Sequence, residues 1–358
     1  MSFFGAKPTL KPAVNESTAQ DVEVPNGPTD SISAISFSPS ADLLAVSSWD
    51  NQIRIYEIGQ SINGKAAYSH EAPVLDVCWS RDGTKVLSGG VDNTARLFDL
   101  QTGTASQVAQ HQAPIRCVRW IDMQNGLLAT GSWDKTIKYW DLRTPNPVAS
   151  VSLEERCYAM DVCGSLLVVG TAERKIQIYN LQNPTAQYGP TIDSPLKFQT
   201  RSIACFPDQT GYAVGSIEGR VAIQYIDEVR AKSENFSFKC HRANEPKVGQ
   251  PKDDSKAQLF AVNAVSFHPI HGTFSTAGSD GTISFWDKTN KTRLKKGKVD
   301  QIMPITSTAF NNTNGSMIFA YAVSYDWAHG FKGNSQSHAN MIKLHICKDD
   351  EIKKRPKA

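Results

Sequence analysis

Short runs of alternating hydrophobic and polar residues occupy most of the chain between residues 30 and 346. In the first copy, LLAVSS (43–48) and IRIYEI (53–58) flank a short polar turn, and SAISFSPSAD (33–42) precedes them. A period of two residues is typical of β-strands, and two such runs around a short turn predict a β-hairpin. No stretch offers sustained apolar residues at i and i+4, so the pattern predicts an all-β protein without long helices.

The hairpin recurs along the chain at a nearly constant spacing. Each copy has a small residue, a tight turn with an acid, and an alternating run that ends in an aromatic residue or its substitute. The copies are SSWDNQIRIY (47–56), GGVDNTARLF (89–98), GSWDKTIKYW (131–140), GTAERKIQIY (170–179), GSIEGRVAIQ (215–224), AGSDGTISFW (277–286), and VSYD (323–326), which resumes as MIKLHI (341–346). The turn acids are Asp50, Asp92, Asp134, Glu173, Glu218, Asp280 and Asp326. Neighbouring acids are 42, 42, 39, 45, 62 and 46 residues apart, and all but one interval lies near the roughly 40–45 residues of a propeller blade.

These units resemble WD repeats. The dipeptides that match or nearly match the name of the repeat are Phe98-Asp99, Trp140-Asp141 and Trp286-Asp287. The resemblance implies an all-β, seven-bladed WD-repeat β-propeller over residues 21–347, with an insertion at residues 242–258 that accounts for the one long interval. We expect DVEV (21–24) to supply the outer strand of the last blade and so to close the ring. Residues 1–20 are expected to form a short disordered N-terminal tail, and residues 348–358 a basic C-terminal tail.

The WD resemblance also implies a hydrogen-bonded tetrad of His, Ser or Thr, turn Asp and terminal Trp within a blade. A third blade keeps His70, Ser88 and Asp92 but has Phe98 in place of the Trp. The two full sets are His111, Thr130, Asp134 and Trp140, and His241, Thr276, Asp280 and Trp286. A catalytic triad is the other interpretation of such a set, but one active site would not recur at constant spacing in successive blades. We therefore expect structural residues and no enzyme activity.

Composition and charge narrow the possible classes of protein and cellular location. The 358 residues include 38 Lys and Arg against 35 Asp and Glu, a formal net charge of +3 that does not by itself indicate a nucleic-acid-binding protein. The seven cysteines are scattered without a CxxC motif, which indicates buried thiols in a reducing compartment and neither a disulfide framework nor a zinc site. We expect no cofactor and no metal. The longest apolar run, residues 317–323, is shorter than the roughly 20 residues of a membrane span, and the N-terminus lacks a signal-peptide pattern. These features favour a cytosolic or nuclear protein.

Two tryptophans and one arginine stand beside turn acids, where small polar residues are the rule. Trp49 and Trp133 each precede a turn acid, and Arg220 follows another in Ile-Glu-Gly-Arg. Because these turns gather on one face of a propeller, all three residues are predicted to lie on one rim. Exposed Trp and Arg side chains are frequent interface anchors. Burial against a neighbouring loop for the tryptophans, and solvation or pairing with Glu218 for Arg220, are the alternatives.

A basic run follows the sixth repeat. Between residues 288 and 298 there are six positive residues and no acid, and aromatic residues Phe238 and Trp286 are candidates to lie near it. The candidate RNA-binding residues are Phe238, Trp286, Lys288, Lys291, Arg293, Lys295 and Lys296. Such a patch attracts polyanions through phosphate contacts, and aromatic rings can stack on bases. The alternatives are that the run is a solvated loop and that the tetrad already uses Trp286.

Several further strings resemble one family, the mRNA-export WD-repeat proteins of the Gle/Rae type, which are related to the Bub-type propellers of the mitotic checkpoint. The strings are DSISAISFSP (30–39), PVLDVCWS (73–80), GSWDKTIKYWDLR (131–143), ERCYAMDV (155–162), GTAERKIQIY (170–179), GSIEGRVAIQYI (215–226), FSFKCHR (236–242), GSDGTISFWDK (278–288) and FAYAVSYDW (319–327). FKCHR with its following insertion, and AYAVSYDW with an extension containing Gly330-Phe331, are similar to the export branch.

This resemblance implies a scaffold that binds the GLEBS segment of a GLFG-class nucleoporin through Trp49 and Arg220. It also implies a groove for nucleic acid, with single-stranded mRNA as the ligand, that maps to Phe238, Trp286 and Lys288. The implied location is the nucleus, nuclear envelope and nuclear pore complex with some protein in the cytoplasm, and the implied role is poly(A) mRNA export. The alternative is a spindle-checkpoint adaptor that binds GLEBS motifs of checkpoint kinases, with mitotic spindle proteins as partners.

Overall fold

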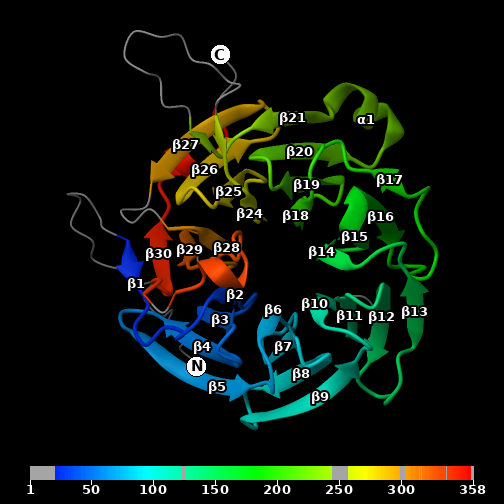
Figure 1. Ribbon diagram of the computed structural model, residues 1–358, viewed down its shortest axis with the longest axis vertical. Coiled ribbons are helices and arrows are strands. Elements are labelled where there is room, and N and C mark those ends of the chain that lie inside the picture. Colours follow the sequence, from blue (N-terminus) through cyan, green and yellow to red (C-terminus); the bar gives the residue numbers. More distant parts are fainter. Residues whose placement is uncertain are drawn as a thin grey trace, which may run out of the picture.

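Seven four-stranded antiparallel sheets surround a central axis in the part of the chain that the structure describes (Figure 1). The computed structural model describes residues 21–122, 126–243, 257–298, 303–313, 315, 317–335 and 337–355. In every sheet the strand nearest the axis comes first in the repeat, and three antiparallel neighbours follow outward. The predicted seven-bladed all-β propeller is confirmed.

The first four blades follow the repeats directly. Blade 1 comprises β2 Ile32–Phe37, β3 Leu43–Ser48, β4 Gln52–Ile58 and β5 Ile62–Ser69. Blade 2 comprises β6 Val74–Trp79, β7 Lys85–Gly90, β8 Thr94–Asp99 and β9 Thr104–Gln110. Blade 3 comprises β10 Ile115–Ile121, β11 Leu127–Ser132, β12 Thr136–Asp141 and β13 Ala149–Ser152. Blade 4 comprises β14 Cys157–Cys163, β15 Leu166–Thr171, β16 Lys175–Asn180 and β17 Ile192–Asp193.

The last three blades carry the additional elements. Blade 5 comprises β18 Thr200–Cys205, β19 Gly211–Ser216, β20 Arg220–Tyr225, helix α1 Glu228–Glu234 and β21 Phe236–Lys239. Blade 6 comprises β24 Val262–Phe267, β25 Phe274–Gly278, β26 Thr282–Asp287 and β27 Thr292–Lys298. Blade 7 comprises β28 Ile305–Phe310, β29 Ile318–Val323, β30 Met341–Ile346 and β1 Val22–Glu23.

The N-terminal segment closes the ring. Strand β1 pairs antiparallel with β30, with Val22 opposite Leu344, and the amide of Val24 donates to the carbonyl of Ile342 at 2.9 Å. The closure expected from DVEV (21–24) is therefore confirmed. Pairing the first and last strands in one sheet removes the open edge that a linear array of blades would expose.

The hydrophobic core lies between neighbouring blades. Middle strands such as β15 are buried along their whole length, because each sheet is covered on both faces by its neighbours. The small residue of the repeat permits this close packing. A Cβ atom on Gly131 would lie 2.6 Å from Sγ of Cys157 in the next blade, and one on Gly89 would lie 2.7 Å from Cγ2 of Ile115. Larger residues at these positions would push the blades apart.

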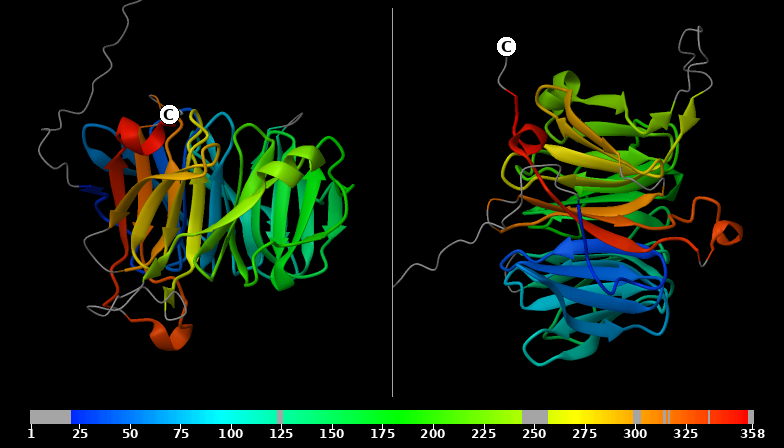
Figure 2. Two further views of the ribbon diagram at one scale, coloured as in Figure 1. Left: turned by 90° about the horizontal axis from the view of Figure 1, so that it is seen from above. Right: turned by 90° about the vertical axis from the view of Figure 1, so that its left-hand side faces the viewer.

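The two faces of the propeller differ. The turn-acid face carries the seven connections between the second and third strands. The last of these, between β29 and β30, is longer and contains the 3₁₀ turn Phe331–Gly333. This segment projects from the turn-acid face, and the short helix α2 Asp349–Ile352 lies towards the opposite face (Figure 2). Within the described residues, no helix is long and apolar enough to cross a bilayer.

The expected tails and insertion are only partly within the described residues. Residues 1–20 and most of the predicted insertion, residues 244–256, lie outside them. The ends of that insertion pair as β22 Arg242–Ala243 and β23 Gln258–Leu259. The expected C-terminal tail includes α2, whose Ile352 is buried, so the chain continues to pack against the propeller after β30.

Candidate functional site: the turn-acid face and a basic patch

The histidines of the repeats lie in buried hydrogen-bond networks. His111 places Nδ1 2.8 Å from Asp134 and Nε2 2.7 Å from Thr130, whose Oγ1 also accepts from the indole of Trp140 at 2.8 Å. Blade 6 repeats the arrangement with distances of 2.7 Å from His241 to Asp280, 3.0 Å from His241 to Thr276 and 3.0 Å from Trp286 to Thr276. Burial lowers the pKa of His111 despite its bond to Asp134. Both ring nitrogens are occupied within the blade, which suits a structural role.

In blade 2, which lacks the tryptophan, another residue supplies the hydrogen-bond donor. His70 contacts Asp92 at 2.9 Å and Ser88 at 2.8 Å. The donor that Phe98 lacks is replaced by the hydroxyl of Tyr68, which donates to Ser88 at 2.9 Å. The Tyr68 ring also stacks on Phe98 with centroids 4.8 Å apart and an interplanar angle of 4°. Burial tends to raise the pKa of Asp92, but its bonds and charge contact with His70 and its bonds with Thr94 outweigh burial and lower that pKa to about 2.

Trp49 forms part of an aromatic stack on the turn-acid face. Its ring stacks on Trp327 with centroids 4.2 Å apart, and Trp327 contacts Tyr325 at 5.6 Å. Trp327 has a φ of 59°, a left-handed backbone conformation that is uncommon for a bulky residue. Trp49 is thus half-buried against the neighbouring segment. The stack joins blade 1 to blade 7 while leaving part of the Trp49 side chain accessible.

Arg220 lies on the same face in blade 5. Its Nε is 3.8 Å from Oε2 of Glu218, and its side chain is 31% exposed against 8% for Glu218. The Glu218 carboxylate is held by the amide of Lys197 at 3.2 Å. Gly219 between them has a φ of +66°, and a Cβ there would lie 2.3 Å from the carbonyl oxygen of His241. The glycine therefore permits the turn that presents Arg220 at the surface.

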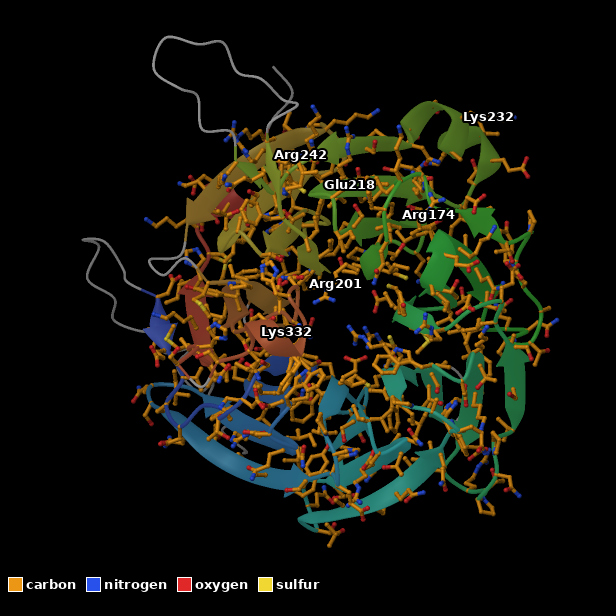
Figure 3. The ribbon with its side chains drawn as sticks, viewed as in Figure 1. Arg174, Arg201, Glu218, Lys232, Arg242 and Lys332 are labelled. Carbon is orange, nitrogen blue, oxygen red and sulfur yellow. The ribbon has the colours of Figure 1, made fainter. Side chains whose placement is uncertain are left out.

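Further arginines approach this part of the face. Arg242 donates to the carbonyl of Glu218 at 3.1 Å, and the two residues lie side by side (Figure 3). Arg201 points towards the central axis (Figure 3), where it donates to the carbonyl of Asp326 at 2.7 Å and so joins blade 5 to blade 7. Burial lowers the pKa of Arg201. The arginines near Glu218 give this region a positive character that favours carboxylate ligands.

Trp133 is the third rim residue that the sequence singles out. It is half-buried, and its indole N–H is buried without a hydrogen-bond partner among the described residues. The turn that holds it is fixed by Ser132, whose hydroxyl accepts from the amide of Asp134 at 3.0 Å. Packing against the propeller thus accounts for much of the Trp133 surface.

A basic and aromatic patch lies at the outer edges of blades 5 and 6. Phe238 of β21 packs on Trp286 of β26 with ring centroids 4.4 Å apart, and both side chains are half-buried. Arg293 lies 5.7 Å from the Trp286 ring centroid, and Lys291 lies 4.9 Å from that of Phe236. We call Phe236, Phe238, Trp286, Lys291, Arg293 and Lys296 the basic-aromatic patch. It brings cations and ring edges together at the surface, as the sequence predicts for this run.

Two of the predicted RNA-binding lysines are engaged elsewhere. Lys288 is only 6% exposed, with Nζ 3.2 Å from Oδ2 of Asp208 and 4.4 Å from the ring centroid of Phe206. Its position between blades 5 and 6 differs from the surface position expected from the sequence. Lys295 is exposed, but its Nζ lies 3.1 Å from Oδ2 of Asp350 in the C-terminal segment.

The C-terminal segment extends the positive region. Arg355 donates to the carbonyl of Leu294 at 2.8 Å, and Lys354 donates to Thr289 at 3.2 Å. These contacts place the basic C-terminal segment along β27. The sequence of residues 288–298 alone did not predict this neighbour. The sequence signal was the basic composition of residues 348–358, whose place next to the patch depends on tertiary packing.

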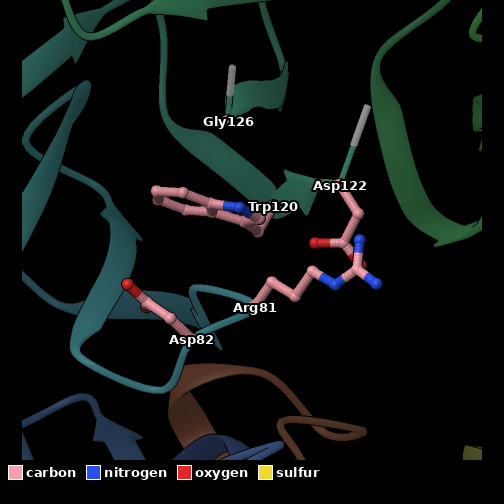
Figure 4. A pocket seen from close by; sticks show the side chains of 5 residues that line it. All are labelled: Arg81, Asp82, Trp120, Asp122 and Gly126. Carbon is pink, nitrogen blue, oxygen red and sulfur yellow. The ribbon is translucent and has the colours of Figure 1, made fainter. Parts of the chain in front are cut away.

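A shallow pocket opens on the opposite face between blades 2 and 3. Its lining residues are Arg81, Asp82, Trp120, Asp122 and Gly126 (Figure 4). Burial raises the pKa of Asp122, and Arg81 opposes that shift. These five described residues include no paired nucleophile and base.

Comparison with known proteins agrees with the repeats. Residues 35–124 match the WD40 domain model of anaphase-promoting complex subunit 4, and residues 255–287 match the WD domain, G-beta repeat. The chain is 53% identical over its full length to the Poly(A)+ RNA export protein of Schizosaccharomyces pombe, covering 99% of that protein. This chain belongs to the Gle/Rae-type family of WD-repeat mRNA export factors.

Two other members of the family show the same full-length match. The mRNA export factor GLE2 of Chaetomium thermophilum is 49% identical over 99% of this chain and 98% of its own length. The protein Rae1 of Drosophila melanogaster is 45% identical over 94% of this chain and 96% of its own. Both matches therefore cover almost the whole length of the two chains compared.

Proposed function

We propose that this protein is a non-enzymatic scaffold of the nuclear pore that takes part in poly(A) mRNA export and binds the GLEBS segment of a GLFG nucleoporin. The observation that carries the proposal is the full-length similarity to proteins named as mRNA export factors. The proposed location is the nucleus and the nuclear pore complex, with some protein in the cytoplasm. A propeller alone would not name this function, because the fold hosts many unrelated ones.

The turn-acid face supports peptide binding through two anchors of different chemistry. Trp49 offers the accessible part of an indole that is already fixed by its stack on Trp327, so little side-chain entropy is lost on binding. Arg220 offers a guanidinium whose contact with Glu218 is long at 3.8 Å. A ligand carboxylate can form closer, bidentate bonds to that group. An acidic and apolar peptide fits this pair.

The two anchors lie on different blades, which limits the kind of ligand. Trp49 follows β3 in blade 1 and Arg220 begins β20 in blade 5, so a peptide that contacts both must cross the turn-acid face. Arg242 beside Glu218 adds a second cation to one end of that path. We infer that acidic residues of the peptide bind near Arg220 and that its apolar residues contact Trp49.

RNA contact is proposed for the basic-aromatic patch. Lys291, Arg293 and Lys296 are exposed, and the nearby rings of Phe238 and Trp286 provide a surface for base stacking. Because Lys288 is buried in a pair with Asp208, we assign it a structural role between blades 5 and 6 and no direct contact with RNA. Each phosphate contact to a single strand adds about 0.7 to the slope of log affinity against log salt.

Affinity purification of the tagged full chain tests the proposal and its alternative. Recovery of a GLFG nucleoporin that carries a GLEBS segment supports the export role. Recovery of a checkpoint kinase without any nucleoporin would refute it in favour of the spindle-checkpoint adaptor. The variant Trp49→Ala with Arg220→Glu should no longer recover the nucleoporin. The matched control Arg81→Glu with Trp120→Ala, which changes the same residue types at the pocket on the opposite face, should recover it as the wild type does.

RNA binding is tested separately with a labelled poly(A) oligonucleotide. The triple variant Lys291→Ala, Arg293→Ala and Lys296→Ala should weaken binding and reduce the salt slope by about 2 for three lost contacts. Lys65→Ala, in the exposed pair with Glu57 on blade 1, is the control for loss of positive charge elsewhere. Equal affinity and slope in the triple variant and the wild type would show that the patch does not bind RNA.

A further inference from the structure

A compact group of polar side chains lies where the two ends of the chain meet. His345 of β30 has Nδ1 2.8 Å from Oδ1 of Asp21 and Nε2 2.9 Å from Oε2 of Glu351. Tyr321 donates to the other oxygen of Asp21 at 2.6 Å. This cluster therefore connects the N-terminal segment, the last blade and helix α2. It lies away from the turn-acid face, and α2 also reaches β27 through the pair of Asp350 and Lys295.

Cys347 completes a set of possible metal ligands. The ligand atoms of His345, Cys347 and Glu351 all lie within 4.8 Å of one another. Cys347 is 1% exposed and Glu351 is 7% exposed, whereas the His345 side chain is 25% exposed. The cluster is thus largely shielded from water but reachable from the side of the imidazole.

The positions of the donors are set by the surrounding backbone. Oε2 of Glu351 accepts from the amide of Lys348 at 2.8 Å, within the capping interaction that begins α2. The bond from Nδ1 to Asp21 orients the imidazole and directs Nε2 towards Glu351. A carboxylate on the outer nitrogen of a histidine is the usual second partner of a metal-bound imidazole.

We propose that His345, Cys347 and Glu351 bind one Zn²⁺ ion or a similar borderline-soft divalent cation, with Asp21 as the partner of the histidine. Imidazole, thiolate and carboxylate are the ligands that Zn²⁺ prefers, and three protein ligands leave a fourth position for water. Binding of the cation releases two protons. One is the hydrogen that lies between Nε2 of His345 and Glu351, and the other is the thiol hydrogen of Cys347.

The expected consequence is a tighter closure of the ring. The cation would link the end of β30 directly to α2, and through His345 and Asp21 to the segment that begins with β1. Because the ligands come from separate elements that meet only in the folded chain, binding stabilises the folded state. The site requires no change in the turn-acid face, so peptide binding and metal binding are separable.

Titration of the chelator-treated full chain with Co²⁺ tests the site, since Co²⁺ reports a thiolate ligand by a charge-transfer band in the near ultraviolet. We expect one Co²⁺ per chain with that band in the wild type and in the control Cys163→Ser, which changes a half-buried thiol of blade 4. Cys347→Ser should abolish the band. Absence of the band in the wild type, or its persistence in Cys347→Ser, would overturn the proposal.

A second variant keeps the test decisive if Cys347→Ser fails to fold. Asp21→Asn retains the size and the hydrogen-bond acceptor but removes the negative charge behind the imidazole. Competition with a Zn²⁺ chelator should give an affinity about 10- to 100-fold weaker than wild type, as for other second partners of metal-bound histidines. An unchanged affinity in Asp21→Asn would place the bound cation elsewhere and contradict the assignment.

Discussion

The hydroxyl of Tyr68 is predicted to replace the indole donor that blade 2 lacks, and Tyr68→Phe removes only that group. The ring stack on Phe98 is retained, whereas Ser88 loses one of its donors. Because Ser88 still contacts His70 at 2.8 Å, the loss is that of one buried hydrogen bond. Tyr68→Phe should therefore lower the free energy of unfolding by about 1 kcal/mol, a factor of about five in the unfolding equilibrium.

Removing the acceptor is predicted to cost more. Ser88→Ala leaves both His70 and the Tyr68 hydroxyl without their shared partner in a site where Ser88 is fully buried. The expected loss is about 2 to 3 kcal/mol. The double variant should lose less than the sum of the two single variants, with a coupling energy of about 1 kcal/mol.

Urea denaturation followed by far-ultraviolet circular dichroism measures these differences. Tyr188→Phe is the matched control, because Tyr188 is 55% exposed and its hydroxyl should contribute little. If Tyr68→Phe is no more destabilising than Tyr188→Phe, or if the two blade 2 substitutions are additive, the hydroxyl does not replace the indole and the reasoning is refuted.

Two further predictions concern charge. Since the folded-state pKa of Asp92 is about 2, below its ordinary value of 3.8, its stabilising contribution is present above pH 4 and is lost as the pH falls through about 2. His70→Gln should flatten that part of the stability profile in denaturation series from pH 5 to 2, and an unchanged slope would contradict the assignment. Lys288→Ala should destabilise the fold by about 1 to 2 kcal/mol through loss of its buried contacts, including that with Asp208, with little change in RNA affinity. Lys296→Ala should weaken RNA binding with little change in stability. If the two variants had equal effects in urea denaturation and in RNA titration, the assignment of separate roles to the two lysines would be refuted.

The architecture could be predicted from the sequence because each blade is a local unit. Turn acids such as Asp50 and Asp92 recur within a window that contains their own strands, so spacing alone indicates the ring. The closure by residues 21–24 was also predictable, since a propeller needs a strand for its last blade. The short helices α1 and α2 break the strand pattern for too few residues to produce a helical period.

Individual contacts between blades were harder to predict from the sequence than the architecture. The burial of Lys288 depends on Asp208, 80 positions earlier in the chain, so a run of lysines looked uniformly exposed. Tyr68 could have been found, because an aromatic hydroxyl stands two residues before His70 in the blade that lacks its tryptophan. The stack of Trp49 on Trp327 depends on ring closure between the first and last blades, which no local pattern encodes.

The central claim is tested most directly by the affinity of the full chain for a synthetic GLEBS peptide, measured by isothermal titration calorimetry. Trp49→Ala combined with Arg220→Glu should weaken binding at least about a hundredfold, since two anchor residues are lost, while the circular dichroism spectrum stays that of the wild type. Wild-type affinity in a folded double variant would contradict the assignment of the turn-acid face as the peptide-binding surface.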